Sequence, residues 1–305
     1  MKVAIYRSAV PAKTKNQFKR DLLTNFALGV SASGDEAIVV DSHEVVAADI
    51  AVLQGWIGFK SAPHLDLRKQ VIDFQRQRGQ HVVVIDSNLF GFLEPADFNR
   101  YLRYSVNGIF PTTGYYFDSQ IDPGRWQEIK DNYSFAEHKW QKNLNGSILI
   151  CLQRDGGWSM GGVKVIDWLS NLLPKIRQHS QRPIVVRGHP GSLKTLVEVT
   201  ARFPDVEISR NEDIRQDFDR AWCTVTYNSS PGVASLLYGI PVIVTDPVPQ
   251  RSQAWPWAST DLAMIEQPWR PDRTEFYNKI SQCHFATRSL SNGRAWQFMR
   301  QRLPT

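Results

Sequence analysis

Short apolar runs alternate with longer amphipathic stretches along most of the chain, a pattern typical of a parallel sheet covered by helices. Each short run is rich in aliphatic residues and stops at a polar residue or a glycine. The first half predicts strands at residues 3–6, 37–40, 50–53 and 82–85, and helices at residues 14–28, 65–77 and 96–104. From residue 111 to 145 the pattern weakens into aromatic and polar loop, with turn signals at Asp122-Pro123-Gly124, and we place a domain boundary there.

The second half restarts the same alternation. It predicts strands at residues 147–152, 183–186, 206–208, 223–227 and 241–245, and helices at residues 163–179, 193–203 and 231–238. Residues 273–303 are expected to be largely helical and to cross back over the first domain. The expected fold class is α/β, with two Rossmann-like domains facing a central cleft. The expected limits are 1–140 and 146–280 for the two domains and 281–305 for the C-terminal helix.

Composition excludes several other classes of protein. Apolar residues make up 42% of the 305 residues and charged residues 22%, which is ordinary for a globular chain and excludes disorder and coiled coils. No apolar run is long enough for a membrane span, and the three cysteines lack the spacing of metal ligands or a disulfide framework. We therefore expect a reduced cytoplasmic protein. The net charge of +6 favours anionic partners.

Three chemically suggestive segments follow strands of the second half, where parallel sheets bind ligands. The first, after residues 147–152, contains Gly156 and Gly157 in a glycine-rich turn that would expose backbone N–H groups to a phosphate. The second contains Arg187 and His189, which suit pairing with, or donation to, a phosphate oxygen. In the third, Ser229 and Ser230 stand at the expected start of a helix, which suits a diphosphate.

The order of these three segments resembles that of the GT-B fold glycosyltransferases, within them the capsule-polysaccharide-synthesis and bacterial sialyltransferase-like groups. The matching residues are Leu152-Gln153-Arg154-Asp155, His189-Pro190, and the stretch from Ser229-Ser230 through Val242. The resemblance implies that His189, Ser229 and Ser230 hold the nucleotide and phosphate of a sugar donor. It departs at Ala234 and Ser235, where many of these enzymes carry a glutamate that contacts the donor ribose.

The first half is expected to bind the acceptor and to supply a catalytic base, as the resemblance implies. Asp86 is the favoured base and Asp155 the next, because each follows a predicted strand and a carboxylate there can accept the hydroxyl proton. Trp56 follows another strand and either stacks on a sugar or base or packs beneath its loop. Arg251 and Trp255 combine charge with an aromatic ring, as phosphate contact with base stacking requires. The same mixture recurs in the C-terminal segment, at Arg288, Arg294, Trp296, Arg300 and Arg302.

The resulting hypothesis is a glycosyltransferase that uses a nucleotide-diphospho-sugar, with UDP favoured, and no metal. The sequence Asp217-Phe218-Asp219 is interpreted as a solvated face because it precedes a strand. The C-terminal segment is similar to glycosyltransferases of bacteriophages, which implies a hydroxyl on a modified, 5-hydroxymethyl-type pyrimidine in double-stranded phage DNA as acceptor, and the host cytoplasm as location. An alternative acceptor is a capsule or other cell-surface polysaccharide, with a CMP-sugar donor. A third interpretation is a non-catalytic nucleotide or nucleic-acid binding module.

Overall fold

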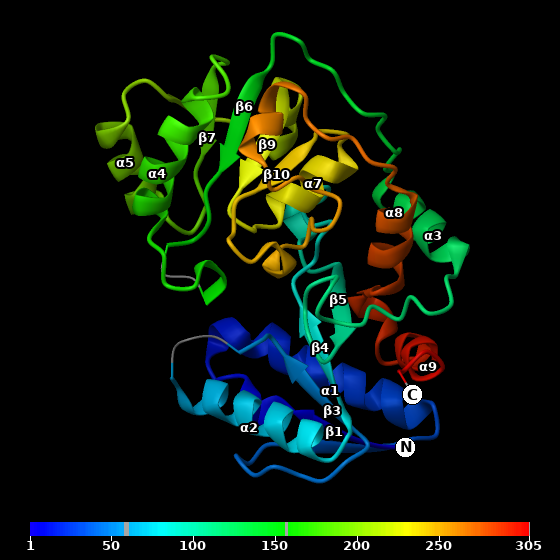
Figure 1. Cartoon of the computed structure of the whole chain (residues 1–305). Coiled ribbons are helices and arrows are strands. Elements are labelled where there is room, and N and C mark those ends of the chain that lie inside the picture. Colours follow the sequence, from blue (N-terminus) through cyan, green and yellow to red (C-terminus); the bar gives the residue numbers. More distant parts are fainter. Residues whose placement is uncertain (58–60, 156–157, 305) are drawn as a thin grey trace. The chain divides into compact units, whose positions relative to one another are not determined.

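The computed structural model describes residues 1–57, 61–155 and 158–304. Two compact units make up the chain (Figure 1). Unit 1 comprises Met1–Ile109, Thr113–Tyr133 and Glu275–Thr305, and unit 2 comprises Phe110–Thr112 and Ser134–Thr274. The domain limits expected from the sequence remain a proposal about which parts fold autonomously.

Unit 1 is built on a six-stranded sheet in the order β11-β5-β4-β3-β1-β2. β1 to β4 run parallel, whereas β5 and β11 are antiparallel to their neighbours. The strands are β1 (Lys2–Tyr6), β2 (Glu36–Val40), β3 (Ile50–Gln54), β4 (His81–Asp86), β5 (Tyr101–Val106) and β11 (His284–Ala286). The strand order reverses between β1 and β3, which places α1 (Gln17–Ala32) and α2 (Pro63–Gln77) on opposite faces (Figure 1).

Unit 2 contains a five-stranded, fully parallel sheet in the order β10-β9-β6-β7-β8. Its strands are β6 (Ser147–Cys151), β7 (Ile184–Arg187), β8 (Glu207–Ile208), β9 (Ala221–Thr226) and β10 (Val242–Val244). Its helices are α4 (Val165–Arg177), α5 (Leu193–Arg202), α6 (Ile214–Phe218) and α7 (Pro231–Leu237). Every residue of β6 and β9 is buried, as expected for the central strands of a sheet covered on both faces. The predicted α/β class is therefore confirmed.

Two sequence-based assignments in unit 1 are wrong. Residues 96–104, predicted as a helix, run into β5 from Tyr101 onward, and this strand is buried along its whole length between β4 and β11. The Asp122-Pro123-Gly124 segment is the start of α3 (Pro123–Tyr133) rather than a turn, and the Asp122 carboxylate accepts a hydrogen bond from the Gly124 N–H at 2.9 Å. Both errors come from reading local composition where tertiary pairing or a cap decides the structure.

The C-terminal segment returns to unit 1, as expected, and most of it is helical, with one short strand between the helices. It consists of α8 (Thr274–Gln282), the strand β11 and α9 (Arg294–Arg300). α9 packs on α1, where Gly29 permits the approach, because a Cβ at this position would lie 1.9 Å from the Leu290 carbonyl oxygen. The Trp296 ring, 1% exposed, meets Phe26 edge-on with ring centroids 5.9 Å apart. α9 thus completes the core of unit 1.

A buried carboxylate fixes α9 to the rest of unit 1. Asp35 accepts hydrogen bonds from the Trp296 indole at 2.7 Å and from the Met1 amino group at 2.6 Å, and Arg300 lies 3.3 Å away. Burial raises the pKa of Asp35, but these hydrogen bonds and the Arg300 charge outweigh it, so the pKa lies below its ordinary value of 3.8. The carboxylate is therefore an anionic anchor for the C-terminal helix.

Replacing Asp35 by alanine should lower the free energy of unfolding by about 2–3 kcal/mol, because the buried indole N–H loses its acceptor. Since the folded pKa is depressed, the contribution of Asp35 is fully present above pH 3.8 and lost as the pH falls below it. Urea unfolding of the Asp35→Ala variant at pH 7 and across the acid range measures both effects. Asp21→Ala, at an exposed position of α1, should change stability by less than about 0.5 kcal/mol. An Asp35→Ala variant as stable as Asp21→Ala would contradict the anchor.

Candidate functional site

The carboxyl ends of β6 and β9 form the topological switch point of unit 2. β6 connects through α4 to β7 on one side, and β9 connects through α7 to β10 on the other. The helices that follow these two loops therefore lie on opposite faces of the sheet, and the strand ends at such a switch point are where open α/β sheets bind ligands. Residues 152–155 and 227–230, singled out in the sequence, occupy these two loops.

Three buried polar side chains tie the two loops together. Gln153 donates from Nε2 to Asn228 Oδ1 at 2.8 Å, and the Asn228 N–H donates back to Gln153 Oε1 at 2.9 Å. Asn228 Nδ2 donates to Asp246 Oδ2 at 2.5 Å, and Asp246 Oδ1 accepts from the Val248 N–H at 2.9 Å. All three are at most 5% exposed. A fully satisfied network of this kind rigidifies the loops on which a ligand would rest.

Asn228 and Asp246 are the site residues that sequence reasoning missed. Both follow strands, β9 and β10 respectively, which is the positional signal that identified the other candidates. Neither residue belongs to a recognisable sequence motif. That the Asn228 amide contacts the Asp246 carboxylate follows only from the pairing of β10 with β9.

His189 lies just beyond β7, half-buried, with its proton position fixed by the backbone. Its Nδ1 accepts a hydrogen bond from the Gly191 N–H at 2.9 Å, so the proton of the neutral imidazole is on Nε2. Burial lowers the pKa of His189, and the charge of the neighbouring Arg154 lowers it further. At neutral pH the ring therefore presents one N–H donor beside an exposed arginine.

Ser229 and Ser230 stand before α7, and neither hydroxyl caps the helix. Ser230 is the N-cap residue, but its side chain makes no capping hydrogen bond. The Ser229 Oγ atom is buried and has no hydrogen-bond partner among the described residues. A buried hydroxyl without a partner costs free energy, which a bound polar ligand would recover.

Arg187 is engaged elsewhere. Its guanidinium forms an ion pair with Asp217 at 2.5 Å and donates to the carbonyl oxygens of Asn211 and Glu212, both at 2.8 Å. Asp217 is 5% exposed and also accepts from Ser209, so the interpretation of Asp217-Phe218-Asp219 as a solvated face is wrong for Asp217. Arg187 holds the segment between β8 and α6 in place.

Of the remaining unit 2 candidates, Asp155 and Arg251 lie at the segment between β6 and α4. Asp155 is exposed and accepts from the N–H of Val165, the first residue of α4, at 3.1 Å. Arg251 is exposed and lies near Gly161. If Gly161 carried a Cβ, that atom would be 3.9 Å from Arg251 Nη1. Trp255 is half-buried. Gly156 and Gly157 lie outside the described residues.

The two unit 1 candidates have structural partners. Asp86, the last residue of β4, forms an ion pair at 2.6 Å with Arg103 of β5, which is 1% exposed. The half-buried Trp56 follows β3, and its carbonyl oxygen accepts from Arg68 Nη1 at 3.1 Å. No group of three or more His, Cys, Asp or Glu residues suited to a metal ion occurs within residues 1–57, 61–155 and 158–304.

The folded structure of the chain is similar to that of a solved transferase. The KpsC beta Kdo 2,4 transferase of Thermosulfurimonas dismutans matches 93% of this chain and 90% of its own, with a TM-score of 0.53 and 13% sequence identity. The chain has a GT-B-type fold. The KpsC beta Kdo 2,7 transferase of the same organism gives a TM-score of 0.49 at 12% identity, over 97% of this chain and 99% of its own. The UDP-GlcNAc 2-epimerase of Methanocaldococcus jannaschii gives 0.37 at 9% identity, over 99% and 100%.

No protein-family model matches the chain, and no curated protein sequence matches it significantly. Across the described part of the GT-B-type fold, no helix combines the length and apolar character needed to cross a membrane.

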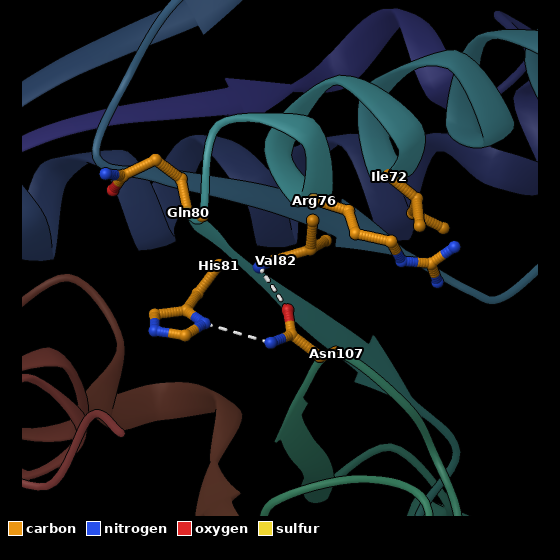
Figure 2. Close-up of a pocket in the computed structure, with 7 residues that line it drawn as sticks. Ile72, Arg76, Gln80, His81, Val82 and Asn107 are labelled. Carbon is orange, nitrogen blue, oxygen red and sulfur yellow. Dashed lines mark hydrogen bonds between the residues drawn. The ribbon is translucent and has the colours of Figure 1, made fainter. Parts of the chain in front are cut away.

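A cavity of about 220 Å³ lies in unit 1 at the amino end of β4, the end away from Asp86 (Figure 2). His81 Nδ1 accepts from Asn107 Nδ2 at 2.9 Å, and Asn107 Oδ1 accepts from the Val82 N–H at 2.9 Å (Figure 2). These side chains satisfy one another, and parallel sheets bind ligands at the other end of their strands. We assign no function to this cavity.

Proposed function

We propose that the chain is a glycosyltransferase that binds a nucleotide-sugar donor at the switch point of unit 2 and transfers the sugar to a hydroxyl of a glycan. The observation that carries the proposal is the convergence of the loops after β6 and β9 at that point, where Gln153 and Asn228 bind each other reciprocally. The loops at this end of the sheet carry neutral N–H and O–H donors and exposed arginines, a set suited to a diphosphate or phosphate.

The proposed donor ligands are His189, Ser229 and Ser230, assisted by Arg154 and Arg251. His189 Nε2 and the two hydroxyls donate hydrogen bonds to phosphate oxygens, and the arginines balance the charge that develops on the leaving nucleotide. We leave Arg187 out of the donor site because its guanidinium is bound to Asp217.

Asp155 is the better of the two proposed bases. Its carboxylate is exposed and uses Oδ1 to cap α4, while Oδ2 makes no hydrogen bond to the described residues. Asp86, in contrast, is the counter-ion of a buried arginine, and removing its charge for catalysis would leave Arg103 unpaired. A carboxylate with one free oxygen beside the donor site is suited to accept the proton of the attacking hydroxyl.

A glycan acceptor has more support than DNA. The chain shares its fold with a Kdo transferase, which acts on a sugar by its name. Two of the C-terminal residues that suggested DNA have structural partners in unit 1, since Trp296 is buried against Asp35 and Arg302 lies over the Phe298 ring. A capsule or other cell-surface polysaccharide is therefore the proposed acceptor class.

A thermal-shift screen against UDP, GDP, CMP and their sugars tests the donor site. A ligand at a hundred times its dissociation constant should add about 2.7 kcal/mol to the free energy of unfolding, and one nucleotide should stand out. That nucleotide identifies the donor, which then serves in a transfer assay with glycan and DNA acceptors, read by mass spectrometry. No shift with any nucleotide would contradict the proposal, and salt-sensitive DNA binding without turnover would favour a binding module.

A further inference from the structure

The carboxyl edge of the unit 1 sheet collects basic side chains from two helices. β1 and β3 end at this edge, and since the strand order reverses between them, unit 1 has a switch point of its own. α1 and α2 each follow one of these strands and begin at the same edge. α1 carries Lys19, and α2 carries His64 and Arg68.

Arg68 is a buried cation held by neutral groups. It is 9% exposed, and it donates from Nη1 to the Trp56 carbonyl oxygen at 3.1 Å and from Nη2 to that of Ala9 at 2.9 Å. Its Nε has no hydrogen-bond partner, and no carboxylate of the described residues lies within ion-pair distance. Burial lowers the pKa of Arg68 to about 10, with Asp86 acting in the opposite direction. An unpaired buried charge of this kind is costly unless an anion joins it.

The loop after β3 is shaped around this guanidinium. Gly55 has a φ of +84°, and a Cβ on this residue would lie 2.9 Å from Arg68 Nη1. A side chain at position 55 would therefore be strained and would press on the arginine. The glycine keeps Arg68 in place between the loops that follow β1 and β3.

Lys19 and His64 lie within electrostatic reach of Arg68. Partial loss of hydration beside the protein lowers the pKa of each of the two, although the Lys19 side chain as a whole is exposed, and the charge of Arg68 lowers each pKa further. Lys19 is exposed and has no carboxylate within ion-pair distance among the described residues. Ser8, just after β1, adds a buried hydroxyl without a hydrogen-bond partner among those residues.

The two carboxylates near these cations are occupied by other groups. Asp86, which interacts electrostatically with Lys19 and Arg68, is bound to Arg103. Asp66, near His64, accepts from the hydroxyl of Ser61 through both of its oxygens. Asp66 and Asp86 therefore attract these cations from a distance, but neither forms an ion pair with Arg68 or Lys19 among the described residues.

We propose that this edge binds one anionic group of the acceptor, a sugar carboxylate or a sugar phosphate, with Arg68 and Lys19 as cationic ligands and Ser8 as a neutral donor. The inference rests on the proposed function and narrows its acceptor to an acidic glycan. One compact cluster around one buried guanidinium fits a single anionic group, whereas a nucleic-acid backbone requires a row of cations along its phosphates.

Calorimetric titration of the full chain tests this site. The probes are tetragalacturonate, its methyl ester, glucose 6-phosphate and the oligonucleotide dT5, which carries four phosphodiesters. We expect tetragalacturonate to bind at least tenfold more tightly than its uncharged ester, and glucose 6-phosphate to compete if the site also takes phosphate. Lys19→Ala should weaken tetragalacturonate binding at least fivefold, whereas Lys69→Ala, which removes an exposed lysine of α2, should change it less than twofold.

Two further variants keep the outcome unambiguous. Arg68→Met should abolish the preference for the acid over the ester, and Lys19→Ala serves alone if that variant does not fold, since Lys19 is exposed. Arg154→Ala removes an exposed arginine of the donor site and should leave the tetragalacturonate affinity within twofold. Equal binding of acid and ester, or equal behaviour of Lys19→Ala and Lys69→Ala, would overturn the inference. Binding of dT5 as tight as that of tetragalacturonate would overturn the assignment to a glycan.

The donor titration separates this inference from the proposed function. Normal nucleotide binding and sugar transfer without any preference for the acid would refute the anion site alone. A preference for the acid that Lys19→Ala removes, in a chain that binds no nucleotide, would refute the glycosyltransferase and leave the anion site standing.

Discussion

Substituting His189 by alanine should reduce sugar transfer about 100-fold and leave the free energy of unfolding nearly unchanged. The ring presents one Nε2–H donor, because its Nδ1 is occupied by the Gly191 N–H. Removing one preorganised donor from developing charge costs about two to three orders of magnitude in rate in other enzymes. Initial rates with the identified nucleotide-sugar, alongside urea unfolding, measure both quantities.

Two other variants sharpen this test. His189→Gln should recover part of the activity, because its amide nitrogen can donate from about the position of Nε2. His179→Ala removes an exposed histidine that follows α4 and should leave the transfer rate unchanged. Full activity in His189→Ala would refute the donor-site assignment. A loss of stability equal to the loss of activity would show instead that the histidine is structural.

Asp86→Ala should lower the free energy of unfolding by about 3 kcal/mol, because it leaves the buried guanidinium of Arg103 without a counter-ion. Among the described residues, Asp86 is the one carboxylate bound to that group, and Arg103 Nε and Nη1 have no partner that would substitute. Breaking a buried pair by removing one partner typically costs about 3–5 kcal/mol, reduced here because Asp86 is itself partly exposed. Equilibrium unfolding in urea measures the change.

The paired variant distinguishes a counter-ion from a catalytic base. Asp86→Ala/Arg103→Met should regain most of the lost stability, because both charges are removed together. Asp73→Ala, which breaks an exposed ion pair with Arg76, should cost less than about 1 kcal/mol. If Asp86 is the base, the single substitution will abolish transfer without destabilising the chain, and the double variant will be stable but inactive.

The parallel strands of both units could be predicted from the sequence because each is a short aliphatic run that ends at a polar residue or a glycine. The antiparallel strands could not. β5 carries Arg103 in its centre, which breaks the apolar run, and β11 is three residues long and follows directly on α8. β5 pairs with β4 on one side and with β11 on the other, and β11 pairs with β5 across about 180 residues of sequence, which no local pattern records.

The site was predictable in position but not in detail. Placing chemistry at the ends of strands led to His189 and Ser229. The hydrogen bond at His189 Nδ1 leaves the N–H donor at Nε2, and the Ser229 hydroxyl has no partner among the described residues. The same reasoning could not tell that Arg187 turns toward Asp217, or that Trp296 is buried against Asp35. In each of these cases a carboxylate distant in sequence decides where a basic or aromatic side chain points.

Unit 1 is formed by segments that precede and follow unit 2 in the sequence, so during synthesis unit 1 is completed after unit 2. Residues 1–109 and 113–133 are made before unit 2, whereas β11 and α9 of the same unit are made after it. Until then β5 is an edge strand with an open row of N–H and C=O groups, and Phe26 lacks its contact with Trp296. Unit 2 is nearly contiguous, so once residue 274 has left the ribosome the nascent chain carries a complete unit 2, while unit 1 is still unfinished and aggregation-prone.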